Sequence, residues 1–261
     1  MRPIWSASLS FSLVNIPVRV YSGASDDDKV KFHMLHEKDL SPVGYAKFCK
    51  AEGTEITNDE IVRGYEYSKG EYVVVSDEEL EHANVARTRS IELLAFVEVD
   101  EIPMPYFEKP YYLEPDKGAD KAYVLLRDAL RDSRKVGVAK YVMRNRESLA
   151  VVQPVGDILV LEQIRFASQV RDAGELRQLD VTADPSELEL ALTLIKHGSR
   201  AFDPGEFRDT YSEEVQRVIA DKVEGRVPAQ KGEAPQPTNV QDLMSVLKAS
   251  LDRQKRTEQV A

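Results

Sequence analysis

The order of its hydrophobic patterns restricts the fold of this chain more than any other sequence feature. Strand-type alternation and β-prone segments fill most of the first 165 residues, and two strong helix patterns follow between residues 184 and 225. A doubly wound or other parallel sheet requires strands and helices to alternate regularly, and this order does not provide that alternation. We therefore expect an α+β domain with a β-barrel-like core.

The first strand pattern covers residues 6–21, SASLSFSLVNIPVRVY. Apolar residues alternate with serines at its beginning, which gives one apolar face and one polar face. After Asn15 the alternation changes phase, and Pro17 follows, where it removes a ladder hydrogen bond. We expect a strand with a bend or a bulge at this point, or an edge strand that tolerates the proline.

The next segment, residues 31–72, is β-prone, aromatic and polar at once, and glycines interrupt it. This composition predicts a long hairpin-like excursion without a core of its own. An amphipathic helix is expected over residues 118–133, because its apolar side chains share one stripe. Strands are expected from residue 136 to residue 166, the first two joined by a hairpin turn at residues 144–146.

Two further helices are expected over residues 185–197, capped by Asp184, and over residues 212–224, capped by Ser212. The composition then changes. Residues 226–239 hold three prolines and few apolar residues, which predicts a flexible linker. Residues 240–261 predict an isolated amphipathic helix, whose apolar stripe includes Leu243, Met244, Leu247 and Leu251.

Motifs for catalysis and cofactor binding are absent from the sequence. It contains no Walker A loop, no dinucleotide-binding glycine pattern, no GxSxG elbow and no HExxH helix. No run approaches the ~18 apolar residues of a membrane span, and the N-terminus lacks the apolar region of a secretory signal. A single cysteine, Cys49, is consistent with a reducing compartment. We expect a cytoplasmic protein with no cofactor and no membrane partner.

One enzymatic alternative rests on His33, His36 and Cys49, which are close in sequence. Such residues serve as metal ligands or as a thiol nucleophile with its base, so they would be the active-site residues of a metal-dependent or thiol hydrolase. Zinc sites need three or four ligands with closely paired spacing, and no second pair occurs in the sequence. We expect no metal at these residues.

The charge pattern points elsewhere. The chain has a formal net charge of -10, yet residues 134–146, RKVGVAKYVMRNR, contain five cations and no carboxylate: Arg134, Lys135, Lys140, Arg144 and Arg146. On a strand, Lys140 and Arg144 lie on one face and Tyr141 on the other, which predicts a sheet with one cationic side. Arginine suits bidentate contact with phosphate. The alternatives are an ordinary solvated strand and a scaffold surface for an acidic protein.

Several segments in the same order resemble the bacterial Ku family, the DNA-end-binding proteins of non-homologous end joining. They are RPIWSASLSFSLVNIPVRVY, FHMLHEKD, IVRGYEYSKGEYVVVSDEEL, YFEKPYYLEPDKGADKAYVLLRDAL and VGVAKYVMRNRESLAVVQP. The resemblance runs from Arg2 to about Gly225 and returns at VQDLMSVLKASL. Ala7 and Ser12 stand where the family usually has glycine, and we expect only a small local effect from either.

The resemblance implies a non-catalytic homodimer that closes a ring around duplex DNA and recruits the multifunctional ATP-dependent DNA ligase. Residues 1–225 are then the Ku core, with a bridge at about 31–72 and a helical arm at about 184–225. The amphipathic helix with Leu243, Met244, Leu247 and Leu251 is the ligase-docking segment. The candidate DNA-binding residues are Arg144, Arg146, Lys140, Arg134, Lys135, Lys31, Lys47, Lys50 and Arg63.

Overall fold

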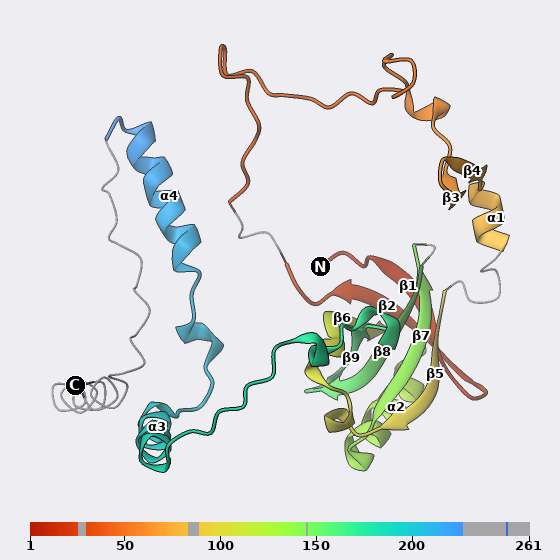
Figure 1. Ribbon diagram of the computed structural model, residues 1–261. Helices are drawn as coiled ribbons and strands as arrows, with labels where there is room; N and C mark the ends of the chain where they lie inside the picture. Colours follow the sequence, from red (N-terminus) through yellow and green to blue (C-terminus); the bar gives the residue numbers. More distant parts are fainter. Residues whose placement is uncertain (26–29, 83–88, 145, 227–248, 250–261) are drawn as a thin grey trace. The chain divides into compact units, whose positions relative to one another are not determined.

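The computed structural model describes residues 1–25, 30–82, 89–144 and 146–226, together with Ala249. The chain divides into two units, residues 1–27 with 32–172 and residues 28–31 with 173–261. The first unit holds a closed β-barrel and the second holds helices α3 and α4 (Figure 1). Among the helices of these residues, none is long and apolar enough to cross a membrane.

Seven strands close the barrel in the order β1-β2-β6-β9-β8-β7-β5. Neighbouring strands are antiparallel except for β1 and β5, whose parallel pairing completes the closure. The expected α+β class with a β-barrel core is therefore confirmed. The strands are β1 Trp5–Phe11, β2 Val14–Ser22, β5 Ser90–Val97, β6 Phe107–Pro115, β7 Val136–Met143, β8 Arg146–Val155 and β9 Ile158–Ile164.

The expectation of one long, bent first strand is wrong. The segment is a hairpin in which β1 and β2 are paired from Phe11 with Val14 to Trp5 with Val20. The turn accounts for the change of phase, because Ser12 has a φ of 52°, in the left-handed region that favours glycine. Tight hairpin turns need such positive φ values to match the twist of the two strands.

Helix α2, Asp120–Ser133, closes one end of the barrel and confirms the helix predicted there. Its buried residues Tyr123, Leu126 and Leu130 belong to the cluster that fills the barrel interior. The Tyr123 hydroxyl donates to the Leu113 carbonyl at 2.6 Å and accepts from the Leu159 backbone N–H at 2.6 Å. The helix is thereby hydrogen-bonded to both β6 and β9.

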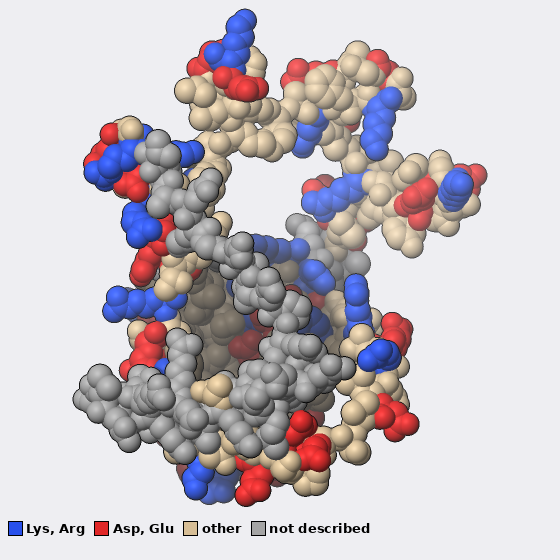
Figure 2. All heavy atoms as spheres, turned by 60° about the vertical axis from the view of Figure 1, so that its left-hand side comes forward, with Lys and Arg blue, Asp and Glu red and all other residues tan. Residues whose placement is uncertain are grey.

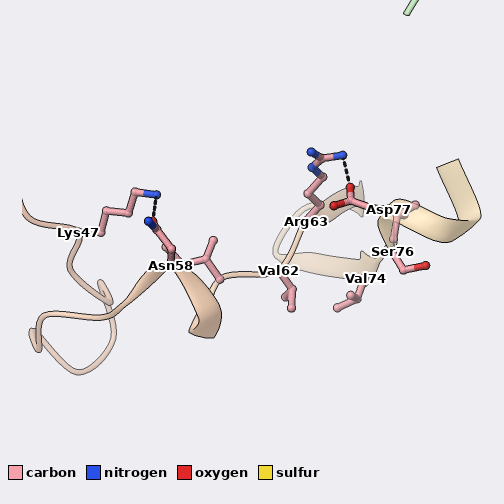
Figure 3. Close-up of a pocket in the computed structure, with 9 residues that line it drawn as sticks. Lys47, Asn58, Val62, Arg63, Val74, Ser76 and Asp77 are labelled. Atoms are coloured by element: carbon pink, nitrogen blue, oxygen red, sulfur yellow. Dashed lines mark hydrogen bonds and ion pairs between the residues drawn. The ribbon is translucent and has the colours of Figure 1, made fainter. Parts of the chain in front are cut away.

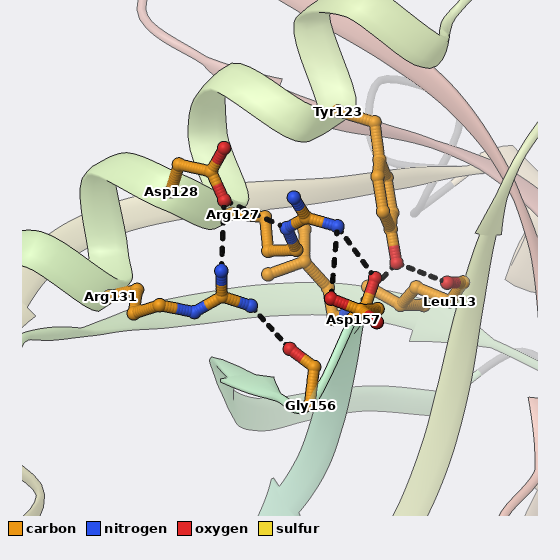
Figure 4. Close-up of polar contacts among 8 residues, drawn as sticks. Leu113, Tyr123, Arg127, Asp128, Arg131, Gly156 and Asp157 are labelled. Carbon is orange, nitrogen blue, oxygen red and sulfur yellow. Dashed lines mark hydrogen bonds and ion pairs between the residues drawn. The ribbon is translucent and has the colours of Figure 1, made fainter.

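Two arginines of α2 hold the turn between β8 and β9 (Figure 4). Arg127 donates to the Asp157 carbonyl at 2.9 Å, and Arg131 donates to the Gly156 carbonyl. Both guanidinium groups also contact Asp128, which lies on the same helix. These two cations are therefore engaged by the fold itself, at the end of the barrel that α2 closes.

A second apolar cluster lies on the outer face of β7, β8 and β9. Val136, Val151 and Ile164 are its buried members, and Ile102 and Tyr106 pack against it from the segment between β5 and β6. Packing on both faces fixes this side of the barrel in place. Short 3₁₀ helices lie here and elsewhere: η1 Asn58–Glu60, η2 Val99–Glu101, η3 Met104–Tyr106, η4 Ala167–Gln169, η5 Ala173–Glu175 and η6 Pro204–Glu206.

The segment between β2 and β5, which we call the excursion (residues 30–82), contains β3 Gly64–Ser68, β4 Glu71–Val74 and α1 Asp77–His82. Strands β3 and β4 form a separate two-stranded sheet. From residue 30 to residue 80 no side chain is buried. The described part of the excursion thus has no core of its own, in agreement with its sequence.

In the second unit, α3 spans Pro185–Gly198 and α4 spans Thr210–Val223. The predicted cap of α3 is confirmed, since Asp184 accepts a hydrogen bond from the Ser186 backbone N–H at 2.8 Å. Helix α4 begins two residues earlier than predicted, because Asp209 and not Ser212 caps it. Neither helix has a buried residue. Apart from Arg226, the linker predicted over residues 226–239 lies outside the described residues, as do the side chains of the C-terminal apolar stripe.

Candidate nucleic-acid interface

The basic stretch 134–146 extends along the full length of β7 and does not form one patch. Arg134 and Lys135 precede the strand at the end closed by α2, whereas Arg144 and Arg146 flank the turn at the other end. Eight strand residues between them span about 26 Å at the rise of an extended chain. The structure therefore places these four predicted DNA-binding residues at opposite ends of the barrel.

At the α2 end, cations lie among carboxylates. Arg134 is the C-terminal cap of α2 with a φ of 54°, and its backbone N–H bonds the Arg131 carbonyl. Lys135 forms an ion pair with Glu98 at 3.2 Å. Helix α2 itself carries Asp120, Asp128 and Asp132, and an Asp157 carboxylate oxygen lies 3.9 Å from the Arg127 guanidinium group. Phosphate at this end would have to approach through like charge.

The prediction of a cationic outer face on β7 is wrong. Lys140 pairs in register with Leu149, a member of the outer apolar cluster, so that face is largely apolar. The Lys140 ammonium lies 3.9 Å from a Glu147 carboxylate oxygen and 6.0 Å from the Phe166 ring centroid. Period-two alternation identified the faces correctly, but the segment that covers the outer face belongs to distant sequence.

The two arginines of the β7–β8 turn differ in placement from Lys140. Arg144 leaves the strand in the left-handed region, with a φ of 55°. Arg146 is paired with Met143, whose side chain packs against the cluster inside the barrel. Directly paired residues lie on the same face of a sheet, so Arg146 is on the inner side and Lys140 on the outer side.

Three more cations lie at the same end of the barrel as this turn. Arg2 precedes β1, Arg89 precedes β5 and Lys109 is near the start of β6. Strand direction places these positions beside the ends of β7 and β8. We call the resulting set the rim: Arg2, Arg89, Lys109, Arg144 and Arg146.

The rim cations have no ion-pair partner in the part of the chain that the structure describes. Within the described residues, no carboxylate oxygen lies within 4.0 Å of any of the five. Lys109 lies 5.6 Å from the Tyr111 ring centroid, where its charge contacts the aromatic face. Arg2, Arg89 and Lys109 could not be recognised from the sequence as part of one cationic site, because each is isolated along the chain and only strand register brings them together.

Buried aromatic residues form the floor beneath the rim. The rings of Trp5 and Tyr141 lie 5.8 Å apart, and the Tyr141 hydroxyl donates to the Gln163 side-chain oxygen at 2.9 Å. Burial raises the pKa of the Tyr141 hydroxyl above its usual value. Burial also raises the pKa of Tyr111, and the positive charge of Arg144 acts in the opposite direction. The carboxylates of Glu108 and Glu162 also raise the pKa of Tyr111, so the packed aromatic base beneath the rim has negative charge close to it.

Both connections between the barrel and the excursion lie at the rim end of the barrel, one after Ser22 in β2 and one before Ser90 in β5. Within the excursion, Lys47 donates to the Asn58 side chain at 2.7 Å, and Arg63 forms a 2.5 Å ion pair with Asp77. These residues line an open groove of about 390 Å³ (Figure 3). Arg63 is thus already paired, whereas Lys47 has only a neutral partner.

The remaining candidates of the excursion are solvent-exposed. Lys50 lies in the first unit and Lys31 in the second. Figure 2 shows Lys and Arg side chains beside Asp and Glu side chains on the viewed face, so neither sign occupies that face alone. In the barrel, Arg127, Arg131, Lys135 and Lys140 each lie near a carboxylate, whereas the rim cations do not within the described residues. Lys117, Lys121 and Arg134 at the α2 end share this lack of an ion pair, so the rim is distinguished by the position of its cations beside the excursion.

The residues of the enzymatic alternative do not form a cluster. His36 Nδ1 lies 3.1 Å from an Asp39 carboxylate oxygen, His33 is exposed and Cys49 is half-buried. Hydrogen bonds from Ser41 are the main reason that the pKa of Asp39 is lowered. In the described part of the chain, no three His, Cys, Asp or Glu side chains are grouped so that they could hold a metal ion.

The barrel interior is filled by side chains, so it is not a ligand cavity. The fold and the rim together define a β-barrel protein that presents exposed cations at one end, next to a long excursion. The chain matches the model of the Ku70/Ku80 β-barrel domain over residues 10–191. It belongs to the Ku family.

Comparison with curated proteins agrees. The chain is 40% identical over 259 residues to the non-homologous end joining protein Ku of Opitutus terrae, covering 97% of this chain and 92% of that one. Identity to the protein of the same name from Symbiobacterium thermophilum is 39%, and the match covers 96% of this chain and 63% of that protein. Identity to the protein of the same name from Archaeoglobus fulgidus is 38%, and the match covers 97% of this chain and 99% of that protein. The resemblance seen in the sequence is confirmed.

Proposed function

We propose that this protein binds the ends of double-stranded DNA without reading sequence, and that it acts in non-homologous end joining of double-strand breaks. The observation that carries the proposal is the rim, whose five cations have no ion-pair partner among the described residues and border both connections to the excursion. Membership of the Ku family and the names of the relatives support the same assignment. No catalytic step is part of the proposed activity.

Contact with phosphate alone explains the lack of sequence specificity. Lys and Arg that bind phosphates release condensed counterions, so log K falls by about 0.9 per neutralised phosphate as log salt rises. Such contacts carry no base information. A negative protein with a local cationic rim also guides DNA to that rim, because the local field rather than the net charge acts on an approaching polyanion.

The proposed binding form is a homodimer whose two barrels and excursions close a ring around the duplex. The second unit supports dimerisation, since α3 and α4 bury none of their residues in the single chain. Leu188, Leu192 and Ile195 of α3 are each more than half exposed. Apolar faces of this kind mark interaction surfaces, and the arm of one protomer would be covered by the other.

The C-terminal segment supplies the proposed contact with an ATP-dependent DNA ligase, through Leu243, Met244, Leu247 and Leu251. An amphipathic helix on a linker suits docking into an apolar groove. Deletion of residues 227–261 is expected to preserve DNA binding and to abolish stimulation of the ligase. Undiminished ligase stimulation by the truncated protein would remove this part of the proposal.

Topology provides the test of end binding. A closed ring can load only at a free end, so the protein should be retained on linear DNA and lost from closed-circular DNA of the same sequence. Retention is measured after a high-salt wash, which removes side-on electrostatic binding. Blocking both ends of the linear DNA after loading should increase retention. Equal retention on the circle and on the linear form contradicts the proposal.

A further inference from the structure

Backbone strain distinguishes three arginines of the barrel. The described non-glycine residues with positive φ are Ser12, Leu40, Arg89, Arg134 and Arg144. Arginine has no local hydrogen bond that favours this region, and the left-handed conformation costs an L-residue free energy that glycine does not incur. Strain of this kind identifies positions where a side chain contributes something outside the local fold.

Arg134 has an ordinary structural explanation, because helices commonly end on a residue in the left-handed conformation. Arg144 opens the two-residue turn between β7 and β8, where a positive φ is required and where glycine or asparagine is the usual residue. Arg89 neither caps a helix nor lies in such a turn. The Arg89 carbonyl accepts from the Ser8 backbone N–H at 2.7 Å, so pairing with β1 fixes the backbone there independently of the side chain. Glycine would satisfy the same hydrogen bond at lower strain.

Strand register brings the strained arginines to one place. Ile91 pairs with Tyr141, and extending that antiparallel register by two residues sets Arg89 opposite Met143. Met143 is paired on its other side with Arg146. Arg89 and Arg146 therefore flank the end of β7, about 10 Å apart at the usual spacing of strands. Arg144 follows Met143 directly.

We propose that Arg89 is a phosphate-binding residue of the rim, and that with Arg144 it is held in a strained conformation that places a cation against the DNA backbone. The proposal rests on the proposed DNA binding and assigns a role to a residue outside the basic stretch. Neither side chain has a carboxylate within ion-pair distance among the described residues, which leaves both guanidinium groups available for a phosphate.

Glycine substitutions separate the effect of each arginine on stability, through backbone strain, from its effect on DNA affinity, through its charge. Arg89→Gly, Arg144→Gly and Arg134→Gly are made singly in the full chain. Melting temperature and affinity for a short blunt duplex are then measured over a range of salt. All three should raise the melting temperature by roughly 2–4 °C, because each relieves left-handed strain. Arg89→Gly and Arg144→Gly should weaken binding about fivefold or more, and lower the salt slope by about 0.9 per protomer.

Arg134→Gly is the matched control, since it removes an equally strained arginine from the α2 end and should leave affinity unchanged. Arg89→Lys keeps the charge and should retain the salt slope. A more stable Arg89→Gly protein that binds like the wild type overturns this inference while DNA binding stands. A loss of stability in Arg89→Gly also overturns it, because the residue is then structural. A wild-type protein without affinity for the duplex contradicts the proposed function itself.

Discussion

Both ends of the barrel carry arginines, but the two ends use them differently. At the α2 end, Arg127 and Arg131 donate to carbonyl oxygens of the β8–β9 turn and contact Asp128. At the rim, Arg144 and Arg146 flank a turn and have no carboxylate within ion-pair distance in the described structure. Arg127 and Arg131 therefore stabilise the fold at one end, whereas the two arginines at the rim remain available.

The comparison shows that charge counts along a sequence do not identify a polyanion site. A guanidinium group that already bonds carbonyls and a carboxylate gains little from a phosphate, because the new contact replaces existing ones. An unpaired guanidinium group gains a charge-assisted hydrogen bond without such a loss. Changes at the rim should thus alter DNA binding, and changes at the α2 end should alter stability.

Reversing the rim charges gives the largest expected effect. Arg144→Glu combined with Arg146→Glu should reduce affinity for linear duplex DNA by about 10²-fold or more, since each protomer replaces two attractive contacts with repulsive ones. Titration of a labelled duplex at fixed salt measures the effect. Circular dichroism should show an unchanged fold, because both residues lie at a solvent-exposed turn.

The matched control reverses two charges at the other end, Lys121→Glu with Arg134→Glu. Both are solvent-exposed and lie at the α2 end. Net charge changes by the same amount in both double variants, so only location differs. If the control loses as much affinity as the rim variant, overall charge governs binding and the contrast between the two ends is wrong.

Loss of a buried hydroxyl group tests whether the α2 end of the barrel stabilises the fold. Tyr123→Phe removes the two hydrogen bonds that link α2 to β6 and β9, and leaves the Leu159 N–H without its partner. We expect the free energy of unfolding to fall by about 1–3 kcal/mol, the cost of leaving buried polar groups unpaired. Denaturant unfolding measures the change. DNA affinity below the unfolding transition should stay at the wild-type value, and a large drop would link α2 to DNA binding.

Local patterns in the sequence predicted most of the barrel. Alternation identified β7, β8 and β9, and the apolar stripe of α2 identified the helix that closes the interior. The first hairpin was missed, because a serine at position 12 gives no signal of positive φ. The outer apolar cluster was also missed, since residues such as Ile102 and Tyr106 cover β7 from a separate part of the chain.

The site was predictable only in part. Arg144 and Arg146 were identified by their position in a basic stretch, but that stretch joins two opposite ends of the barrel. Arg2, Arg89 and Lys109 are far apart in sequence, and only the pairing of strands across a closed barrel places them together. Assembly of a site from isolated positions depends on register, and register is not a local property of the sequence.

The smallest expected effect is at the β1–β2 turn. This turn lies at the α2 end, because β1 runs away from the rim. Ser12 has a φ of 52°, in the left-handed region that glycine adopts without strain, so a glycine here would change backbone strain more than bulk. Ser12→Gly should raise the free energy of unfolding by about 0.5–1 kcal/mol.

Denaturant midpoints at constant m-value measure this gain. Leu13 offers a control, since it is 96% exposed and its φ is not positive, and glycine there should be neutral or destabilising. DNA affinity should be unchanged in both variants, because neither residue is at the rim. A destabilised Ser12→Gly protein would show that the serine side chain stabilises the turn more than its backbone conformation costs.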